Sequence, residues 1–172
     1  MLDIKEFVSI LKERNYEFEL HEHKPLFTVE ESKKLRGKIK GVHSKNLFLK
    51  NKKNNFFLVS CEESEKVDLK KISKFLMLGN VSFAKEELLF KYLGIKPGSV
   101  SPFALLNDKN NFVSFFLEEK LHDSDFINFH PLINNATINM YTNNFIGFMV
   151  ENNKKIHIFS IQKGKVIKTY GY

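Results

Sequence analysis

Short apolar segments with two different periodicities alternate along this chain, and this alternation constrains its fold more than any other feature. In one strand-like segment, Tyr16, Phe18 and Leu20 alternate with Glu17 and Glu19. Further strand patterns cover residues 47–50, 56–61, 103–106, 112–117, 137–141 and 156–161. Helical patterns cover residues 2–14, 68–76 and 84–93, and a last one ends near residue 150. Because helices interleave with strands while hairpin-like turns are frequent, we predict an α/β fold with a mixed sheet and surrounding helices.

Capping residues support these helix boundaries. Asp3 and Asp68 precede two of the helical segments and can cap them. Gly94 follows a third, and Asn143 or Asn144 can cap the last. The helical segments therefore have defined ends.

Length and composition indicate one domain, residues 1–172. A chain of 172 residues with 42% hydrophobic and 27% charged residues can form a single core. Cys61 is the only cysteine and lies in an apolar run, so we expect a small core residue and no intramolecular disulfide. We find no apolar run long enough to span a bilayer, and we expect a cytoplasmic protein without a membrane partner.

Positive charge is concentrated in one interval. The net charge is +7, from 27 Lys and Arg against 20 Asp and Glu. No carboxylate lies between Glu31 and Glu62, while this interval holds Lys33, Lys34, Arg36, Lys38, Lys40, Lys45, Lys50, Lys52 and Lys53. Solvated lysines on an exposed face have the same pattern. The interval nevertheless favours contact with a phosphate backbone.

The Gly98 segment, residues 98–102, predicts a turn with a fixed shape. It consists of Gly98, Ser99, Val100, Ser101 and Pro102, and it lies between two apolar segments. Proline restricts φ and has no N–H group. Such a turn can present backbone N–H and C=O groups to a small polar ligand, although an ordinary connection between elements has the same composition.

Two polar side chains beside apolar runs could carry chemistry. Lys45 stands where the 47–50 strand begins, so its ammonium could bind a phosphate or a substrate carbonyl. His130 precedes Pro131, which favours an extended backbone, and could donate a hydrogen bond or transfer a proton. From the residues alone, a solvated lysine and a structural histidine explain them at least as well.

Histidines 21 and 23 flank Glu22, but they do not predict a metal site. Two residues apart on a strand share a face, and we find no third ligand at a suitable spacing. We expect structural or surface roles for both.

Four segments in order resemble the YbaK/ProX superfamily of aminoacyl-tRNA editing domains. They are residues 25–32, 45–50, 98–103 and 129–131. The chain is most similar to the freestanding prolyl-tRNA-type deacylases, and the resemblance runs from about Leu20 to about Phe148. It implies an α/β fold with a partly closed, mixed sheet around a small pocket.

The resemblance also implies roles for individual residues. Lys45 matches the lysine most tied to deacylation, the Gly98 backbone would orient the ester, and His130 would position the substrate. The implied substrate-binding residues are Phe27, Thr28, Val29, Asn46, Ser99, Val100, Ser101, Pro102 and Phe129. We expect Lys38, Lys40, Lys50 and Lys52 to bind tRNA. The family requires no metal and no other cofactor.

The leading hypothesis is a trans-editing deacylase that hydrolyses mischarged tRNA(Pro), in the first place alanyl-tRNA(Pro). A small pocket can exclude a larger side chain, whereas a synthetase pocket discriminates poorly against a smaller one. The expected partners are the acceptor end of the tRNA and prolyl-tRNA synthetase, and the expected state is a monomer or weak dimer. Two alternatives stay open, namely a cysteinyl-tRNA(Pro) deacylase and a non-catalytic tRNA- or synthetase-binding module.

Overall fold

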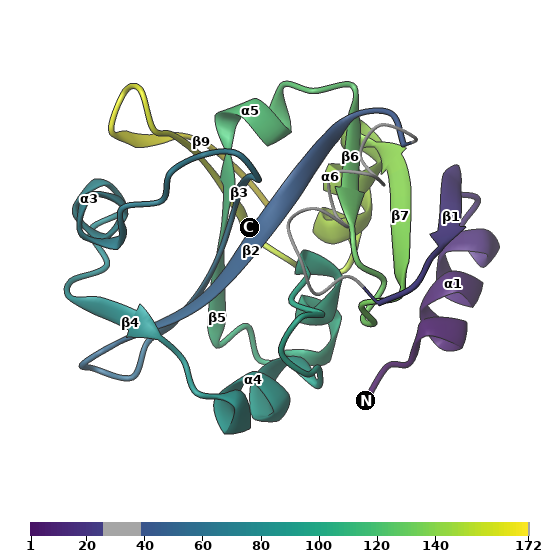
Figure 1. Ribbon diagram of the computed structural model, residues 1–172, viewed down its shortest axis with the longest axis horizontal. Helices are drawn as coiled ribbons and strands as arrows, with labels where there is room; N and C mark the ends of the chain where they lie inside the picture. The colour runs from purple at the N-terminus through teal and green to yellow at the C-terminus, as the bar shows by residue number, and fades with distance from the viewer. Residues whose placement is uncertain (26–38, 172) are drawn as a thin grey trace.

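The computed structural model describes residues 1–25 and 39–171 (Figure 1). Phe27, Thr28, Val29 and Lys38 lie outside these described residues. The predicted roles of these four residues therefore stay predictions.

The described residues form nine strands, five α-helices and one 3₁₀ helix. In chain order they are α1 (Ile4–Glu13), β1 (Phe18–Glu22), β2 (Val42–Asn51), β3 (Phe56–Glu62), α3 (Leu69–Phe75), β4 (Val81–Phe83), α4 (Glu86–Leu93), η1 (Pro102–Asn107), β5 (Val113–Glu118), α5 (Glu119–His122), β6 (Phe126–Phe129), β7 (Ala136–Tyr141), α6 (Thr142–Glu151), β8 (Ile156–Ser160) and β9 (Lys165–Tyr170). The mixed α/β fold predicted from the sequence is confirmed.

Strand β2 joins the two parts of the sheet. The main strand order is β1-β7-β6-β2-β3-β5-β8-β9, and β4 pairs separately with the far end of β2. β2 runs parallel to β6 but antiparallel to β3, whereas β3, β5 and β8 are mutually parallel neighbours. In Figure 1, β2 crosses the molecule diagonally, with α1 and β1 at one end and α3 at the other. A residue on β2 therefore lies near the centre of the fold.

Hydrophobic clusters cover both faces of the sheet. On β3, Phe56 and Leu58 enter the larger cluster, whereas Phe57, Val59 and Cys61 enter the smaller one. Helices α1, α4 and α6 contribute to the larger cluster and α3 to the smaller. Because strand side chains alternate between faces, neighbouring β2 residues also face different surroundings.

The turn and cap chemistry of the N-terminal half agrees with the sequence. The Asp3 carboxylate accepts a hydrogen bond from the Glu6 N–H, and the Glu6 carboxylate accepts one from the Asp3 N–H, which completes a capping box. Asp68 caps α3, and Gly94 ends α4 with a φ of 67°. These boundaries are confirmed.

The strand predicted over residues 103–106 is wrong, because this segment is the 3₁₀ helix η1. The Ser101 hydroxyl accepts from the Phe103 N–H at 3.3 Å, and Pro102 occupies the first turn. A capping serine followed by proline starts a helix. Residues 102–106 are all buried, so their apolar character reflects burial on every side and not a strand periodicity.

Strand boundaries elsewhere also differ from the prediction. β2 begins at Val42, so Lys45 lies inside the strand and not at its start. Its first residues pair with β6, which the sequence patterns did not predict. The strand predicted over residues 156–161 is also not the last one, because β9 pairs with β8 as a further edge strand.

Helix α6 starts two or three residues earlier than predicted and without an asparagine cap. It follows β7 directly, and Tyr141 at its N-cap position makes no side-chain capping bond. The Thr142 N–H instead donates to the Asp125 carbonyl at 3.0 Å, so a neighbouring loop replaces the predicted cap. None of the helices in the described ranges is long and apolar enough to cross a membrane.

Candidate active site

The ammonium group of Lys45 is held by two main-chain carbonyl groups. Lys45 Nζ donates to the Glu63 carbonyl at 3.2 Å and also to the Glu65 carbonyl. Both carbonyls belong to the 62–65 turn (Glu62, Glu63, Ser64 and Glu65), which follows β3. Since an ammonium has three N–H donors, these contacts fix its position while using two of them.

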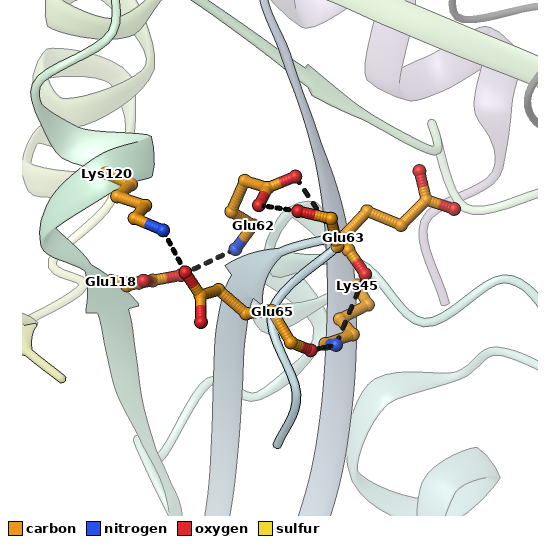
Figure 2. Close-up of polar contacts among 7 residues, drawn as sticks. Lys45, Glu62, Glu63, Glu65, Glu118 and Lys120 are labelled. Carbon is orange, nitrogen blue, oxygen red and sulfur yellow. Dashed lines mark hydrogen bonds and ion pairs between the residues drawn. The ribbon is translucent and has the colours of Figure 1, made fainter.

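The 62–65 turn is itself tied to three neighbouring elements (Figure 2). The Glu63 N–H donates to the His43 carbonyl of β2 at 2.9 Å. The Glu62 N–H donates to the carboxylate of Glu118 at 2.7 Å, and Lys120 pairs with the carboxylate of Glu65. The turn is therefore anchored to β2, to the end of β5 and to α5.

Asn46, the next residue along β2, connects the strand to the Gly98 segment. Its amide Nδ2 donates to the Val100 carbonyl at 3.0 Å, and its Oδ1 accepts from the hydroxyl of buried Ser60 at 2.6 Å. In the strand register Asn46 pairs with Ser60 and Lys45 with Cys61. The two residues consequently lie on opposite faces of β2.

Gly98 is the exposed residue of its segment. Its φ is +86°, and the Ser99 N–H donates to the Lys96 carbonyl at 3.1 Å, so Pro97 and Gly98 form the centre of a tight turn. Ser99, Ser101 and Pro102 are buried, and the Val100 and Ser101 carbonyls accept hydrogen bonds within the protein. The segment therefore presents fewer backbone groups outward than the sequence suggested.

His130 is held at the end of β6 by the backbone of β7. Its Nδ1 lies 2.8 Å from the Ala136 carbonyl, so the ring donates there and leaves Nε2 as the acceptor in the neutral form. Burial lowers the pKa of His130, while the Glu63 carboxylate acts in the opposite direction.

The loop after His130 approaches the Gly98 segment. A Cβ atom placed on Gly98 would lie 3.7 Å from the amide nitrogen of Asn134. Phe129, by contrast, is fully packed between Phe103 and Phe145, with ring centroids 5.9 and 4.9 Å away. Phe129 supports the position of His130 from inside the core. Because its ring is buried, it has no exposed surface for the predicted contact with substrate.

The predicted tRNA-binding lysines lie at the two ends of β2. Lys40 is exposed just before the strand, over the Phe126 ring at 4.3 Å, and Lys52 is exposed in the β2–β3 turn. Lys50 is half-buried near that turn. They do not form one compact patch, and Lys154, also from a basic stretch, is buried instead.

Sequence reasoning missed the groups that hold Lys45. Glu62, Glu63 and Glu65 come directly after a predicted strand, and this position was a usable signal. Glu118 and Lys120 are 56 and 55 positions from their partners Glu62 and Glu65. Only the parallel pairing of β3 with β5 brings them together, and this pairing has no local sequence signature.

The surroundings of Cys61 and of the pair His21 and His23 fit structural roles. Burial raises the pKa of Cys61 to about 12, which keeps its thiol protonated. His21 contacts Glu19 at 3.1 Å, and His23 contacts the hydroxyl of Thr137 at 3.0 Å. Within residues 1–25 and 39–171, no three His, Cys, Asp or Glu residues are grouped to hold a metal.

A family model now identifies the type of domain that carries this arrangement. The model described as "Aminoacyl-tRNA editing domain" matches residues 23–148, which include every described residue discussed above as part of the site. The chain belongs to the aminoacyl-tRNA editing domain family. The resemblance noted in the sequence is therefore confirmed.

Two relatives show how far this similarity extends. The chain is 35% identical over 149 residues to "Prolyl-tRNA synthetase associated domain-containing protein 1" of Danio rerio, covering 86% of this chain and 81% of that protein. It is 34% identical over 139 residues to "Prolyl-tRNA editing protein ProX" of Acetoanaerobium sticklandii, covering 80% and 85%.

The same fold occurs in a solved structure. The crystal structure of "a putative trans-editing enzyme for prolyl tRNA synthetase" has a TM-score of 0.66 with this chain and 17% sequence identity. The match covers 91% of this chain and 96% of that one. At this identity the likeness concerns the fold.

Proposed function

We propose that this protein is a trans-editing aminoacyl-tRNA deacylase that hydrolyses the ester of mischarged tRNA(Pro), in the first place alanyl-tRNA(Pro). The family membership of the chain and the name of its bacterial relative support an editing role. The proposed partners are the acceptor end of the mischarged tRNA and prolyl-tRNA synthetase, whose charging errors the hydrolysis would correct.

One observation in the site carries the proposal. Adjacent residues of β2 support two parts of the candidate site, with Lys45 fixed by the 62–65 turn and Asn46 bonded to Val100. The two side chains lie on opposite faces of β2, so this one strand supports the cationic donor from one face and, through Asn46, the glycine turn from the other. Pre-positioned donors stabilise a developing oxyanion better than mobile ones.

The reaction needs no covalent enzyme intermediate. A water molecule attacks the ester carbonyl, the bond to the ribose oxygen breaks, and the amino acid leaves as a carboxylic acid while the ribose oxygen regains a proton. The remaining N–H of the Lys45 ammonium would stabilise the charge on the carbonyl oxygen. The Gly98 backbone would orient the ester, and a ribose hydroxyl would help to activate the water.

His130 fits a positioning role in this scheme. Its Nδ1 is engaged by the Ala136 carbonyl, and a lowered pKa keeps the ring neutral at physiological pH. Nε2 can then accept a hydrogen bond from the attacking water or from a substrate hydroxyl. The imidazole would thereby hold a reacting group without carrying a charge into the site.

A single-turnover assay on three substrates tests the proposal. Alanyl-, cysteinyl- and prolyl-tRNA(Pro) are incubated separately with the protein, and we expect alanyl-tRNA(Pro) to be hydrolysed fastest. The Lys45→Ala variant should lose at least about 100-fold in rate, comparable with removal of one oxyanion donor. Lys66→Ala is the control, because Lys66 is exposed beside the same turn.

Each alternative function predicts a different result. Fastest hydrolysis of cysteinyl-tRNA(Pro) would assign the cysteinyl specificity instead. Binding of tRNA without hydrolysis of any of the three esters would indicate a non-catalytic module. Near-normal turnover by a folded Lys45→Ala variant would remove Lys45 from the mechanism.

A further inference from the structure

The position of the Lys45 ammonium depends on residues that do not touch it. Its two carbonyl acceptors belong to the 62–65 turn, and a turn of this length is rigid only where its own groups are anchored. Figure 2 shows Glu118 and Lys120 on one side of this turn and Lys45 on the other.

Glu118 anchors the start of the turn. Its side chain is 2% exposed, and its carboxylate accepts from the Glu62 N–H at 2.7 Å. β3 and β5 run parallel up to the pair Ser60 and Leu117, so this side-chain bond continues the ladder one step beyond the last pair. Without it, a backbone N–H at the end of β3 would lose its partner, which is costly in a protein interior.

Lys120 anchors the end of the turn. Its ammonium pairs with the Glu65 carboxylate, and this contact raises the pKa of Lys120. Inside the turn, the Glu65 N–H donates to the Glu62 carbonyl at 3.1 Å, and the Ser64 N–H donates to the Glu62 carboxylate at 3.0 Å. The turn thus has internal bonds, while Glu118 and Lys120 fix it relative to α5 and β5.

We propose that Glu118 and Lys120 are positioning residues for Lys45. They hold the 62–65 turn so that the Glu63 and Glu65 carbonyls aim the lysine ammonium at the substrate. The effect on hydrolysis rests on the proposed function. The effect on the position of the Lys45 ammonium does not depend on that function. The side chains need no contact with tRNA, because they act through the turn.

The structure offers a matched control on the same helix. Glu119, the neighbour of Lys120, pairs with Lys163 at 2.6 Å. Lys163 lies far along the chain, and this ion pair does not involve the 62–65 turn. Both ion pairs link α5 to another segment through an exposed lysine. Lys163→Met therefore removes a comparable contact and should leave Lys45 unaffected.

The first test reads the position of Lys45 without any enzymatic activity. Lysines are labelled briefly with acetic anhydride, and the labelling rate of each is measured by mass spectrometry. We expect Lys45 to react several-fold faster in Glu118→Leu and Lys120→Met than in the wild type, and Lys50 and all lysines of Lys163→Met to react unchanged. Unchanged labelling of Lys45 in both variants would overturn the proposal, whether or not the protein hydrolyses tRNA.

The second test separates positioning from structural loss. At saturating mischarged tRNA we expect about a tenfold lower hydrolysis rate for Lys120→Met and a larger loss for Glu118→Leu, with unchanged tRNA affinity. Glu118→Gln and Lys120→Arg should restore most of the rate, since each keeps the anchoring bond. If Glu118→Leu does not fold, Lys120→Met decides, because that side chain is 60% exposed.

The outcomes distinguish the two proposals. Absence of hydrolysis of all three esters by the wild type contradicts the proposed function, and the labelling result then decides the positioning proposal alone. Conversely, an inactive Lys45→Ala beside fully active Glu118→Leu and Lys120→Met variants contradicts only the positioning role.

Discussion

At the scale of single residues, Gly98 combines an exposed position with a backbone angle that other residues adopt at a cost. Its φ of +86° has a counterpart in Gly79, whose φ is +75° and around which nothing lies within 4 Å. Alanine at either position is therefore strained by the backbone and not by a clash with the protein. We expect both variants to lose about 1 kcal/mol of stability.

The two glycines should differ in catalysis. Gly98→Ala should lower single-turnover hydrolysis strongly with little change in tRNA affinity, because most affinity comes from phosphate contacts. Gly79→Ala should hydrolyse normally. Ser99→Ala should also be mild, and an inactive Ser99→Ala beside an active Gly98→Ala would point to a serine-dependent mechanism instead.

His130 gives a prediction in pH. Burial lowers its folded-state pKa below the ordinary value of 6.5, so the folded protein favours the neutral ring. The associated stability is present above pH 6.5 and is lost as the pH falls through the folded-state pKa. Urea unfolding of His130→Gln should therefore lose less stability over this acidic window than the wild type, and identical slopes would contradict the assignment.

Individual roles were only partly predictable from the sequence. The motif around Lys45 and Asn46 is local, so their importance could be recognised, but their opposite orientations follow from the register of β2 with β3. The buried pair Asn128 and Asn139, which both donate to the Lys40 carbonyl, also depends on strand pairing. Contacts between distant segments leave no pattern in either segment alone.

At the scale of elements, β2 separates the lysines expected to bind tRNA. Its ten residues span roughly 33 Å at about 3.3 Å each, with Lys40 before it and Lys52 after it. A duplex stem has phosphates at such separations, so these lysines would contact different phosphates. We expect Lys40→Gln and Lys52→Gln each to reduce the salt dependence of tRNA binding by about one phosphate contact, additively.

Lysines of the C-terminal hairpin provide the comparison. Lys165 and Lys168 lie on β9, the edge strand at the other end of the sheet order from β1. Their glutamine variants should leave the salt dependence unchanged, and amino-acid preference should not change in any variant. Loss of binding confined to the β9 variants would move the tRNA surface to that hairpin.

Element prediction succeeded where periodicity and caps agreed and failed where burial was uniform. Helices α1 and α3 have an amphipathic pattern and an aspartate cap, so both were predictable. η1 has neither polar face nor alternation, because it is enclosed by the core. β6 has only four residues, and its identity as a strand comes from its partners β2 and β7.

At the scale of the whole molecule, Lys154 stabilises the fold from inside. Its ammonium donates to the Asp108 carbonyl at 2.5 Å and to Asn111 Oδ1 at 2.7 Å, connecting the segment after α6 to the loop before β5. Burial lowers its pKa. Lys154→Met should reduce the free energy of unfolding by about 2 kcal/mol in urea titrations, because the carbonyl of buried Asp108 loses its partner.

The neighbouring lysine is the control for this effect. Lys155 is exposed, so Lys155→Met should change the free energy of unfolding by less than about 0.5 kcal/mol. Equal values for the two variants would show that the buried contacts of Lys154 contribute nothing specific.

The pairing of β1 with β7 has a consequence for biosynthesis. The hydrogen bond between His23 and Thr137 joins residues 114 positions apart. β2 likewise pairs with β6, a strand that is synthesised much later. At about 5–20 residues per second, a ribosome needs roughly 6–23 seconds to make that stretch. During this time β1 and the strand that carries Lys45 have no partners on that side, so the growing chain contains most of its candidate site residues well before the sheet can bring them together.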